Sequence, residues 1–173
     1  VFDFLPNVEK IAKGLPSLNL RFLFTNPKDM GKSGGIFSTI IGTIVLTMMA
    51  ILIATPLGVG TAIYLTEYTR ENKVTRIIRF GSECLAGIPS IIFGLFGFIL
   101  FVTILKFGWS ILSGSLTLAF MILPTIIRTS EEEIKSVPRS YREVSYSLGS
   151  TKWQMVTRVV LPSATAGIVT GII

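Results

Sequence analysis

The sequence predicts an all-α membrane protein, a polytopic bundle of transmembrane helices. Half of its 173 residues are hydrophobic, only 15% are charged, and the mean hydropathy is +0.67. This composition is too apolar for an ordinary soluble domain. Apolar stretches recur along the chain, each close to the roughly 20 residues that a helix needs to cross a bilayer. They are separated by loops that hold most of the charged residues.

Four spans are expected in chain order. The first contains Pro56 near its end, where proline is expected to bend the helix. The second contains Gly87 and Pro89, so we expect a broken helix there. The third contains Pro124, and the fourth begins just after the second charged loop. The expected spans cover residues 36–64, 85–105, 109–127 and 153–173, and together they make a transmembrane domain over residues 36–173.

Basic residues indicate the orientation of these spans. They gather in two loops, as Arg70, Lys73, Arg76 and Arg79 in the first, and Arg128, Lys135, Arg139, Arg142, Lys152 and Arg158 in the second. The opposite side carries Lys106, with Lys28 and Lys32 shortly before the first span. Loops rich in Lys and Arg stay in the cytoplasm. Residues 1–35 are therefore expected to form an external polar segment, which requires an earlier span in a longer parent protein.

Several kinds of chemistry are excluded by composition. The chain has no histidine and a single cysteine, Cys84, so it cannot build a disulfide or a Cys/His metal site by itself. It shows no nucleophile–base pair, and we expect no catalytic residue, metal or cofactor. Gly31-Lys32-Ser33 resembles part of a phosphate-binding P-loop, but the required earlier glycine is replaced by Asn26. The net charge of +6 fits membrane orientation better than nucleic-acid binding.

The second charged loop, residues 129–152, contains several helix-start signals. Three pairs fit the capping-box pattern, namely Ser130 with Glu133, Ser140 with Glu143, and Thr151 with Gln154. Gly149 fits the position just after a helix end, where a residue without a Cβ is favoured. The pattern predicts a short helix over residues 141–148, a tight turn, and a new helix that enters the bilayer. Such a helix is marginal alone and needs packing to persist.

This loop resembles the cytoplasmic loop motif of ABC importer permeases, which reads E-A-A, three residues, G, nine residues, I-x-L-P. Glu143, Gly149 and Pro162 fall at those spacings. Three positions depart from the motif: Val144 and Ser145 replace the alanines, and Val159 replaces the isoleucine. The resemblance implies that the short helix docks on an ATPase subunit. The implied coupling residues are Tyr141, Arg142, Glu143, Val144, Ser145, Leu148 and Gly149. The alternative is a generic interfacial hairpin between two spans.

A wider resemblance covers nearly the whole chain. The stretches GGIFSTIIGT, PLGVGTAIYLTEY, LAGIPSIIFGLFG and LPTIIRTSEEEIKSVPRSYREVSYSLGSTKWQ are similar to the PstA family of phosphate ABC transporter permeases. This implies six spans in the parent, of which the chain covers the second to the fifth. It also implies a multi-pass protein of a bacterial or archaeal cell membrane. The implied partners are ATP-binding cassette ATPase subunits, which hydrolyse the ATP, a sister permease PstC, an external phosphate-binding protein, and membrane lipid.

Three polar residues are candidates for a pathway that takes phosphate. Arg128, at the end of the third span, is expected either to attract the anion or to anchor the helix at the membrane surface. Glu83 would repel phosphate, so we expect it to pair with Arg128 or Arg79. Ser90 follows Pro89 and either faces the pathway or bonds its own helix.

Other functions stay open at this point. The cytoplasmic loop is shared among importers, so sulfate, molybdate or phosphonate is an alternative substrate. A secondary transporter also uses broken helices, although it needs no ATPase-docking loop. A scaffold that senses phosphate without moving it is a further alternative. A membrane-bound enzyme is disfavoured by the missing catalytic groups.

Overall fold

A computed structural model describes residues 24–28, 33–69 and 72–172 of the chain. It divides into two compact units, Val1–Val45 and Leu46–Ile173. In the first unit, β1 (Pro27–Lys28) pairs with β2 (Ser33–Gly34) in an antiparallel register. Most of the expected external segment, residues 1–23 and 29–32, lies outside the described residues.

The first expected span is confirmed as a long helix. α3 (Phe37–Ile63) continues without a break into the π-helical turn η4 (Tyr64–Tyr68), and together they make 32 residues. Pro56 lies inside α3 and does not end it. Alanines at positions 50, 54 and 62 are buried, so one side of the helix is smooth enough for close packing.

The second expected span, residues 85–105, is broken, and its helical part begins earlier than expected, at Lys73. The chain forms α4 (Lys73–Ala86), breaks, and continues as α5 (Ser90–Gly97) and η5 (Phe98–Ile104), with a bend of 100°. Pro89 explains the break, since proline disfavours a helical conformation in the residue before it. The break expected there is confirmed. Among the described residues, three helical segments are long and apolar enough to cross a membrane, or four with this bent pair counted as one.

The third helix is longer than expected. α6 (Ile111–Ser136) begins at a capping box between Ser110 and Ser113 and runs beyond the expected end at residue 127. The helix start predicted at Ser130 is therefore wrong. Ser130 lies fully buried inside the last third of α6, because the apolar face of this helix continues through Ile134 and keeps it packed.

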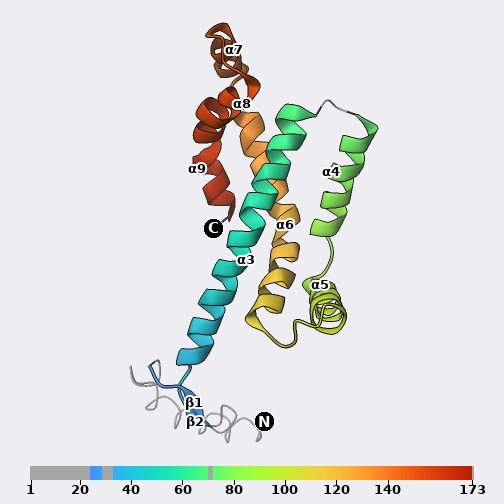
Figure 1. Cartoon of the computed structure of the whole chain (residues 1–173), viewed down its shortest axis with the longest axis vertical. Coiled ribbons are helices and arrows are strands. Elements are labelled where there is room, and N and C mark those ends of the chain that lie inside the picture. The colour runs from blue at the N-terminus through green and yellow to red at the C-terminus, as the bar shows by residue number, and fades with distance from the viewer. Residues whose placement is uncertain (1–23, 29–32, 70–71, 173) are drawn as a thin grey trace, which may run out of the picture. The chain divides into compact units, whose positions relative to one another are not determined.

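The loop after α6 contains the short helix α7 (Arg139–Ser147), which lies beyond the ends of α6 and α9 (Figure 1). Its exit turn leads into α8 (Lys152–Met155), η6 (Val156–Val160) and α9 (Leu161–Ile172). These three elements form one helical segment of 21 residues and confirm the fourth expected span.

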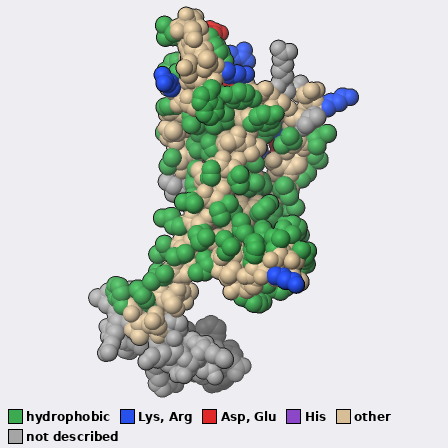
Figure 2. Space-filling model, viewed as in Figure 1, with side chains coloured by type: hydrophobic (Ala, Val, Ile, Leu, Met, Phe, Trp, Pro, Cys, Tyr) green, Lys and Arg blue, Asp and Glu red, His purple; other side chains and the backbone are tan. Residues whose placement is uncertain are grey.

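α6 occupies the centre of the second unit and packs against α4, α5 and α9. Buried apolar residues of α3 and α6 form one core cluster, in which Ala50 and Ala54 meet Ala119 and Ile126. A second cluster joins the end of α3 to α6, α8, η6 and α9, and it contains Ala62, Ile134, Val137, Met155, Val156, Val160, Ala164 and Ile168. Hydrophobic side chains also cover the outer surface of the bundle (Figure 2), as expected for helices that face lipid.

Candidate functional site

The candidate site is the end of the bundle that carries α7. Basic side chains gather at this end in the space-filling view, whereas the body of the bundle is mostly hydrophobic (Figure 2). The elements that meet here are η4, α4, the end of α6, α7 and α8. The site therefore lies where the two basic loops of the sequence come together.

α7 begins differently from the prediction. The capping box of Ser140 with Glu143 is wrong, because α7 starts at Arg139 after Pro138, which makes no side-chain cap hydrogen bond. Pro138 holds φ at −56° and ψ at 141°, a conformation that enters a helix without needing a backbone N–H. Ser140 is thus already inside the first turn of α7.

The end of α7 matches the prediction. Gly149 has φ of +78°, in the left-handed region that glycine adopts without a steric penalty. Its N–H donates to the Tyr146 carbonyl at 2.9 Å, and the hydroxyls of Ser145 and Ser150 lie 2.6 Å apart. The chain thereby turns tightly out of α7.

The next helix also begins as predicted. The Thr151 N–H donates to Gln154 Oε1 at 2.9 Å, and the Gln154 N–H donates to Thr151 Oγ1 at 3.3 Å. This reciprocal capping box fixes where α8 starts relative to the turn.

The outer face of α7 is apolar and largely exposed. Tyr141, Val144 and Leu148 are spaced to lie on one side of the helix and are 52%, 59% and 83% exposed. They line a groove of about 890 Å³ together with Ser145, Gly149, Ser150, Gln154, Arg158, Val159, Pro162 and Ser163. Five of the seven predicted coupling residues, Tyr141, Val144, Ser145, Leu148 and Gly149, therefore share this groove.

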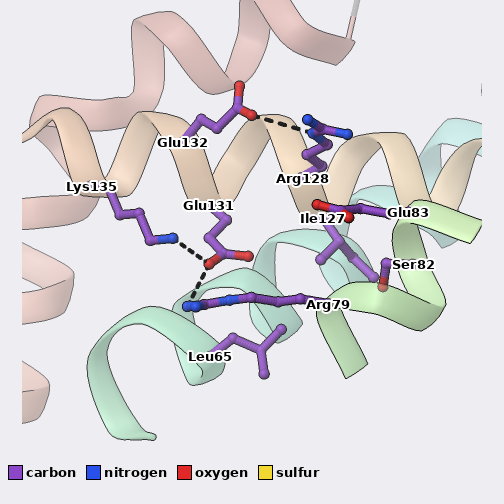
Figure 3. A pocket seen from close by; sticks show the side chains of 9 residues that line it. All are labelled: Leu65, Arg79, Ser82, Glu83, Ile127, Arg128, Glu131, Glu132 and Lys135. Atoms are coloured by element: carbon purple, nitrogen blue, oxygen red, sulfur yellow. Dashed lines mark hydrogen bonds and ion pairs between the residues drawn. The ribbon is translucent and has the colours of Figure 1, made fainter. Parts of the chain in front are cut away.

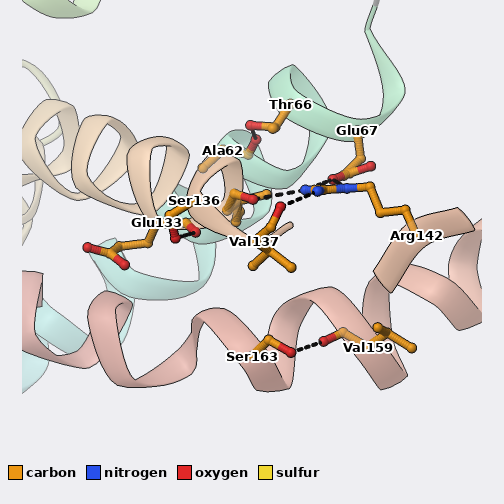
Figure 4. A network of polar contacts seen from close by, with 10 residues as sticks. Ala62, Thr66, Glu67, Glu133, Ser136, Val137, Arg142, Val159 and Ser163 are labelled. Atoms are coloured by element: carbon orange, nitrogen blue, oxygen red, sulfur yellow. Dashed lines mark hydrogen bonds and ion pairs between the residues drawn. The ribbon is translucent and has the colours of Figure 1, made fainter. Parts of the chain in front are cut away.

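The other two predicted coupling residues lie on a different side of α7. Arg142 points inward (Figure 4): its Nη2 lies 2.8 Å and its Nε 3.0 Å from Glu67 Oε1. The same guanidinium donates to the carbonyls of Val137 at 2.6 Å and Ile134 at 2.9 Å. Glu143 is exposed and lines a second groove beside Arg142.

A second charged cluster joins α4 to α6 (Figure 3). Glu131 Oε1 lies 2.6 Å from Arg79 Nη2 and 2.6 Å from Lys135 Nζ, and the Glu131 side chain is 9% exposed. Arg128 instead pairs with Glu132 one turn along the same helix, with Nε and Oε1 3.3 Å apart. These charges line a cavity of about 130 Å³.

The structure brings two of the three pathway candidates together. Arg128 and Glu83 both line the 130 Å³ cavity. The expected pairing of Glu83 with Arg128 or Arg79 is not what the structure shows for these residues. Arg128 pairs with Glu132 and Arg79 with Glu131, both carboxylates of α6. Ser90 is the exposed first residue of α5, at the bend, and it is not among the described residues that line this cavity.

Sequence reasoning missed Glu67 and Glu131, the two carboxylates that are buried at the site. Their side chains are only 8% and 9% exposed. A signal was present, since each is an acidic residue next to the end of an apolar helix on the basic side of the chain. Buried carboxylates need a charged partner, so each implied an arginine or lysine from another element.

Comparison with known proteins finds a family of membrane transport components. The family described as binding-protein-dependent transport system inner membrane component matches residues 54–173. The chain is 37% identical over 163 residues to the probable ABC transporter permease protein YqgI of Bacillus subtilis, covering 94% of this chain and 55% of the relative. It is 39% identical over 165 residues to the phosphate transport system permease protein PstA of Xylella fastidiosa, covering 94% of this chain and 57% of the relative.

A solved structure shares the fold. The MetNI methionine ABC transporter, in an inward-facing conformation, matches with a TM-score of 0.61 and 26% identity, over 80% of this chain and 64% of that one. The chain spans little more than half the length of the curated relatives named above. Three observations support the same family. The helices are long and apolar enough to cross a membrane, a short helix lies at their basic end, and the family matches residues 54–173. The protein belongs to the binding-protein-dependent transport system inner membrane components.

Proposed function

We propose that this protein is a permease subunit of an ATP-driven importer of inorganic phosphate. The observation that carries the proposal is α7, whose outer apolar face is largely exposed and whose inner face is tied to the bundle. An uncovered row of apolar side chains on a short helix is typical of a surface that docks in a partner's groove. Phosphate is supported by the similarity to the phosphate transport system permease protein PstA of Xylella fastidiosa.

The partners follow from this assignment. An ATP-binding cassette ATPase receives the face made by Tyr141, Val144 and Leu148, and Gly149 sets the turn behind it. The ATPase hydrolyses ATP, and the permease carries out no covalent chemistry. A sister permease of the PstC type completes the pathway, and an external binding protein delivers phosphate. The α7 end faces the cytoplasm, in keeping with its concentration of basic residues.

The pathway residues stay proposals of the same kind. Arg128 and Glu83 line one cavity at the α7 end, and the exposed guanidinium of Arg128 supplies positive charge that attracts an anion. Glu132 lies beside Arg128 and limits that attraction. Ser90 offers a hydroxyl at the 100° bend, where the helix is interrupted.

The test is ATPase activity of the protein that carries this chain, reconstituted with its sister permease, ATPase and binding protein. Phosphate, sulfate, molybdate and phosphonate are added separately. Stimulation by phosphate alone is expected. Stimulation by another anion would keep the importer and change its substrate. Failure of the ATPase to remain bound to the permease would contradict the docking role of α7.

Other functions fit less well. The similarity to a methionine transporter indicates that this fold does not fix the substrate, so another oxyanion is the second candidate. A secondary transporter has no need of an uncovered apolar helix at the basic end. Co-purification of an ATPase with the permease separates these two classes.

A further inference from the structure

Arg142 holds three elements together. Its guanidinium contacts the Glu67 carboxylate on η4 and two carbonyls at the end of α6, while its own backbone belongs to α7. The Arg142 and Glu67 side chains are 17% and 8% exposed, so solvent and salt screen this pair less than a surface pair. An arginine fork suits such an arrangement, because its N–H groups point in fixed directions toward several acceptors.

The ion pair between Arg142 and Glu67 connects two elements that the chain itself does not connect directly. α7 is connected covalently to α6 through Val137 and Pro138, and to α8 through the turn at Gly149. η4 has no such short connection to α7, because Glu67 and Arg142 are 75 positions apart in the sequence. Among the described residues, one other polar contact reaches η4 from beyond α7: Lys152 Nζ lies 5.1 Å from the centre of the Tyr68 ring. A cation–π contact at an exposed site is weaker than a buried ion pair.

We infer that Arg142 is a positioning residue that transmits displacement of α7 to the ends of α3 and α6, rather than a contact with the ATPase. The inference rests on the proposed function, in which an ATPase moves α7. A force applied to the apolar outer face reaches the bundle through what the inner face holds. Glu67 receives it for α3, and the carbonyls of Ile134 and Val137 receive it for α6.

The end of α6 extends the same connection. The last carbonyls of a helix carry partial negative charge and favour a cation, which Arg142 supplies. One turn earlier on α6, Glu131 pairs with Arg79 of α4. Displacement of α7 therefore reaches α3 directly and α4 through α6.

The variants separate transmission from assembly. Glu67→Gln keeps the shape of the side chain and the contacts of Arg142 with α6, but it removes the charge on the α3 side. Arg142→Gln removes both connections, and Arg142→Lys keeps the charge but loses the fork. Arg76→Gln is the matched control, because Arg76 is an exposed arginine of α4 at the same end of the bundle.

The experiment uses the complete transporter in proteoliposomes and measures phosphate uptake and ATP hydrolysis in the same vesicles. The expected result for Glu67→Gln is normal assembly with phosphate moved per ATP reduced about tenfold, within the usual range of coupling between sites. Arg142→Lys lowers the amount of phosphate moved per ATP only in part, and Arg76→Gln leaves it unchanged. The double variant with both glutamines falls no further than Arg142→Gln alone, because the two residues act as one unit.

Two results would overturn the inference. One is a loss of uptake and hydrolysis in the same proportion as the loss of assembled complex, which is what a purely structural ion pair gives. The other is an unchanged ratio in Glu67→Gln and Arg142→Gln. A wild-type complex that hydrolyses ATP but takes up no phosphate would instead refute the proposed function, and with it the inference that rests on it.

Discussion

Two ion pairs at the α7 end have the same chemistry and very different surroundings. Arg142 and Glu67 join α7 to η4 at 2.8 Å, with side chains 17% and 8% exposed. Arg128 and Glu132 lie one turn apart on α6 at 3.3 Å, with side chains 58% and 66% exposed. The first pair connects two elements that are distant in sequence, whereas the second connects two residues of the same helix. Burial and sequence separation, not the presence of opposite charges alone, therefore decide how much an ion pair contributes to the fold.

The largest effect is expected from breaking the buried pair. Arg142→Gln leaves the Glu67 carboxylate buried with a neutral partner, and such a loss destabilises a protein by about 3 kcal/mol. The transporter in detergent should therefore show a clearly lower thermal midpoint. Arg128→Gln is the control and should shift the midpoint little. Equal shifts for the two variants would remove the distinction between the pairs.

Two glycines in α3 offer the same comparison between a packed and an open position, without any charge. A Cβ on Gly58 would lie 2.6 Å from Ile126 Cγ2 of α6, whereas a Cβ on Gly60 would meet nothing within 4 Å. Gly58→Ala should destabilise the bundle by about 1–3 kcal/mol through overpacking. Gly60→Ala should be neutral or stabilising, by up to about 1 kcal/mol, because alanine favours a helix. Thermal midpoints of the two variants measure the difference, and the reverse order would contradict the packing of α3 on α6.

The turn after α7 tests a purely local constraint. Gly149 has φ of +78° and open space around its Cβ position, so within this chain a side chain there acts through backbone strain. Gly149→Val should cost about 1–2 kcal/mol and weaken ATPase retention on the permease. Gly149→Asn should keep most of the ATPase retention, because asparagine tolerates the left-handed region. Pull-down of the ATPase with each variant decides the matter, and normal phosphate transport by Gly149→Val would contradict the role given to this turn.

The smallest effect on stability belongs to the exposed pair itself. Arg128→Gln should change the free energy of unfolding by less than about 1 kcal/mol, as for other surface ion pairs. Its effect on function is expected to be separate, with reduced phosphate uptake in an intact complex and partial uptake in Arg128→Lys. Uptake assays on both variants and the wild type check this. Equal uptake by all three would leave Arg128 only the role of a membrane-surface anchor.

Local patterns in the sequence predicted the local features of the fold. The apolar stretches predicted the helices that start near residues 37, 111 and 152, and Gly149 and the Thr151–Gln154 pair were correct. These features depend on a few neighbouring residues, so the sequence contains all the information they need.

Features that depend on packing were not predictable in the same way. Ser130 has the pattern of a helix start, but contacts with other helices bury it inside α6. Arg142 fits a motif for coupling, but the direction of its side chain follows from where Glu67 lies, 75 positions away in the sequence. A motif indicates which helix matters, whereas only the arrangement of helices indicates which side of it faces the partner.

An uncovered row of Tyr141, Val144 and Leu148 also bears on how much of this protein a cell can hold unassembled. Apolar side chains exposed to water promote aggregation and attract the machinery that degrades unpaired subunits. Under the proposed function, copies made in excess of the ATPase would therefore be short-lived, and the abundance of this protein would follow that of the ATPase.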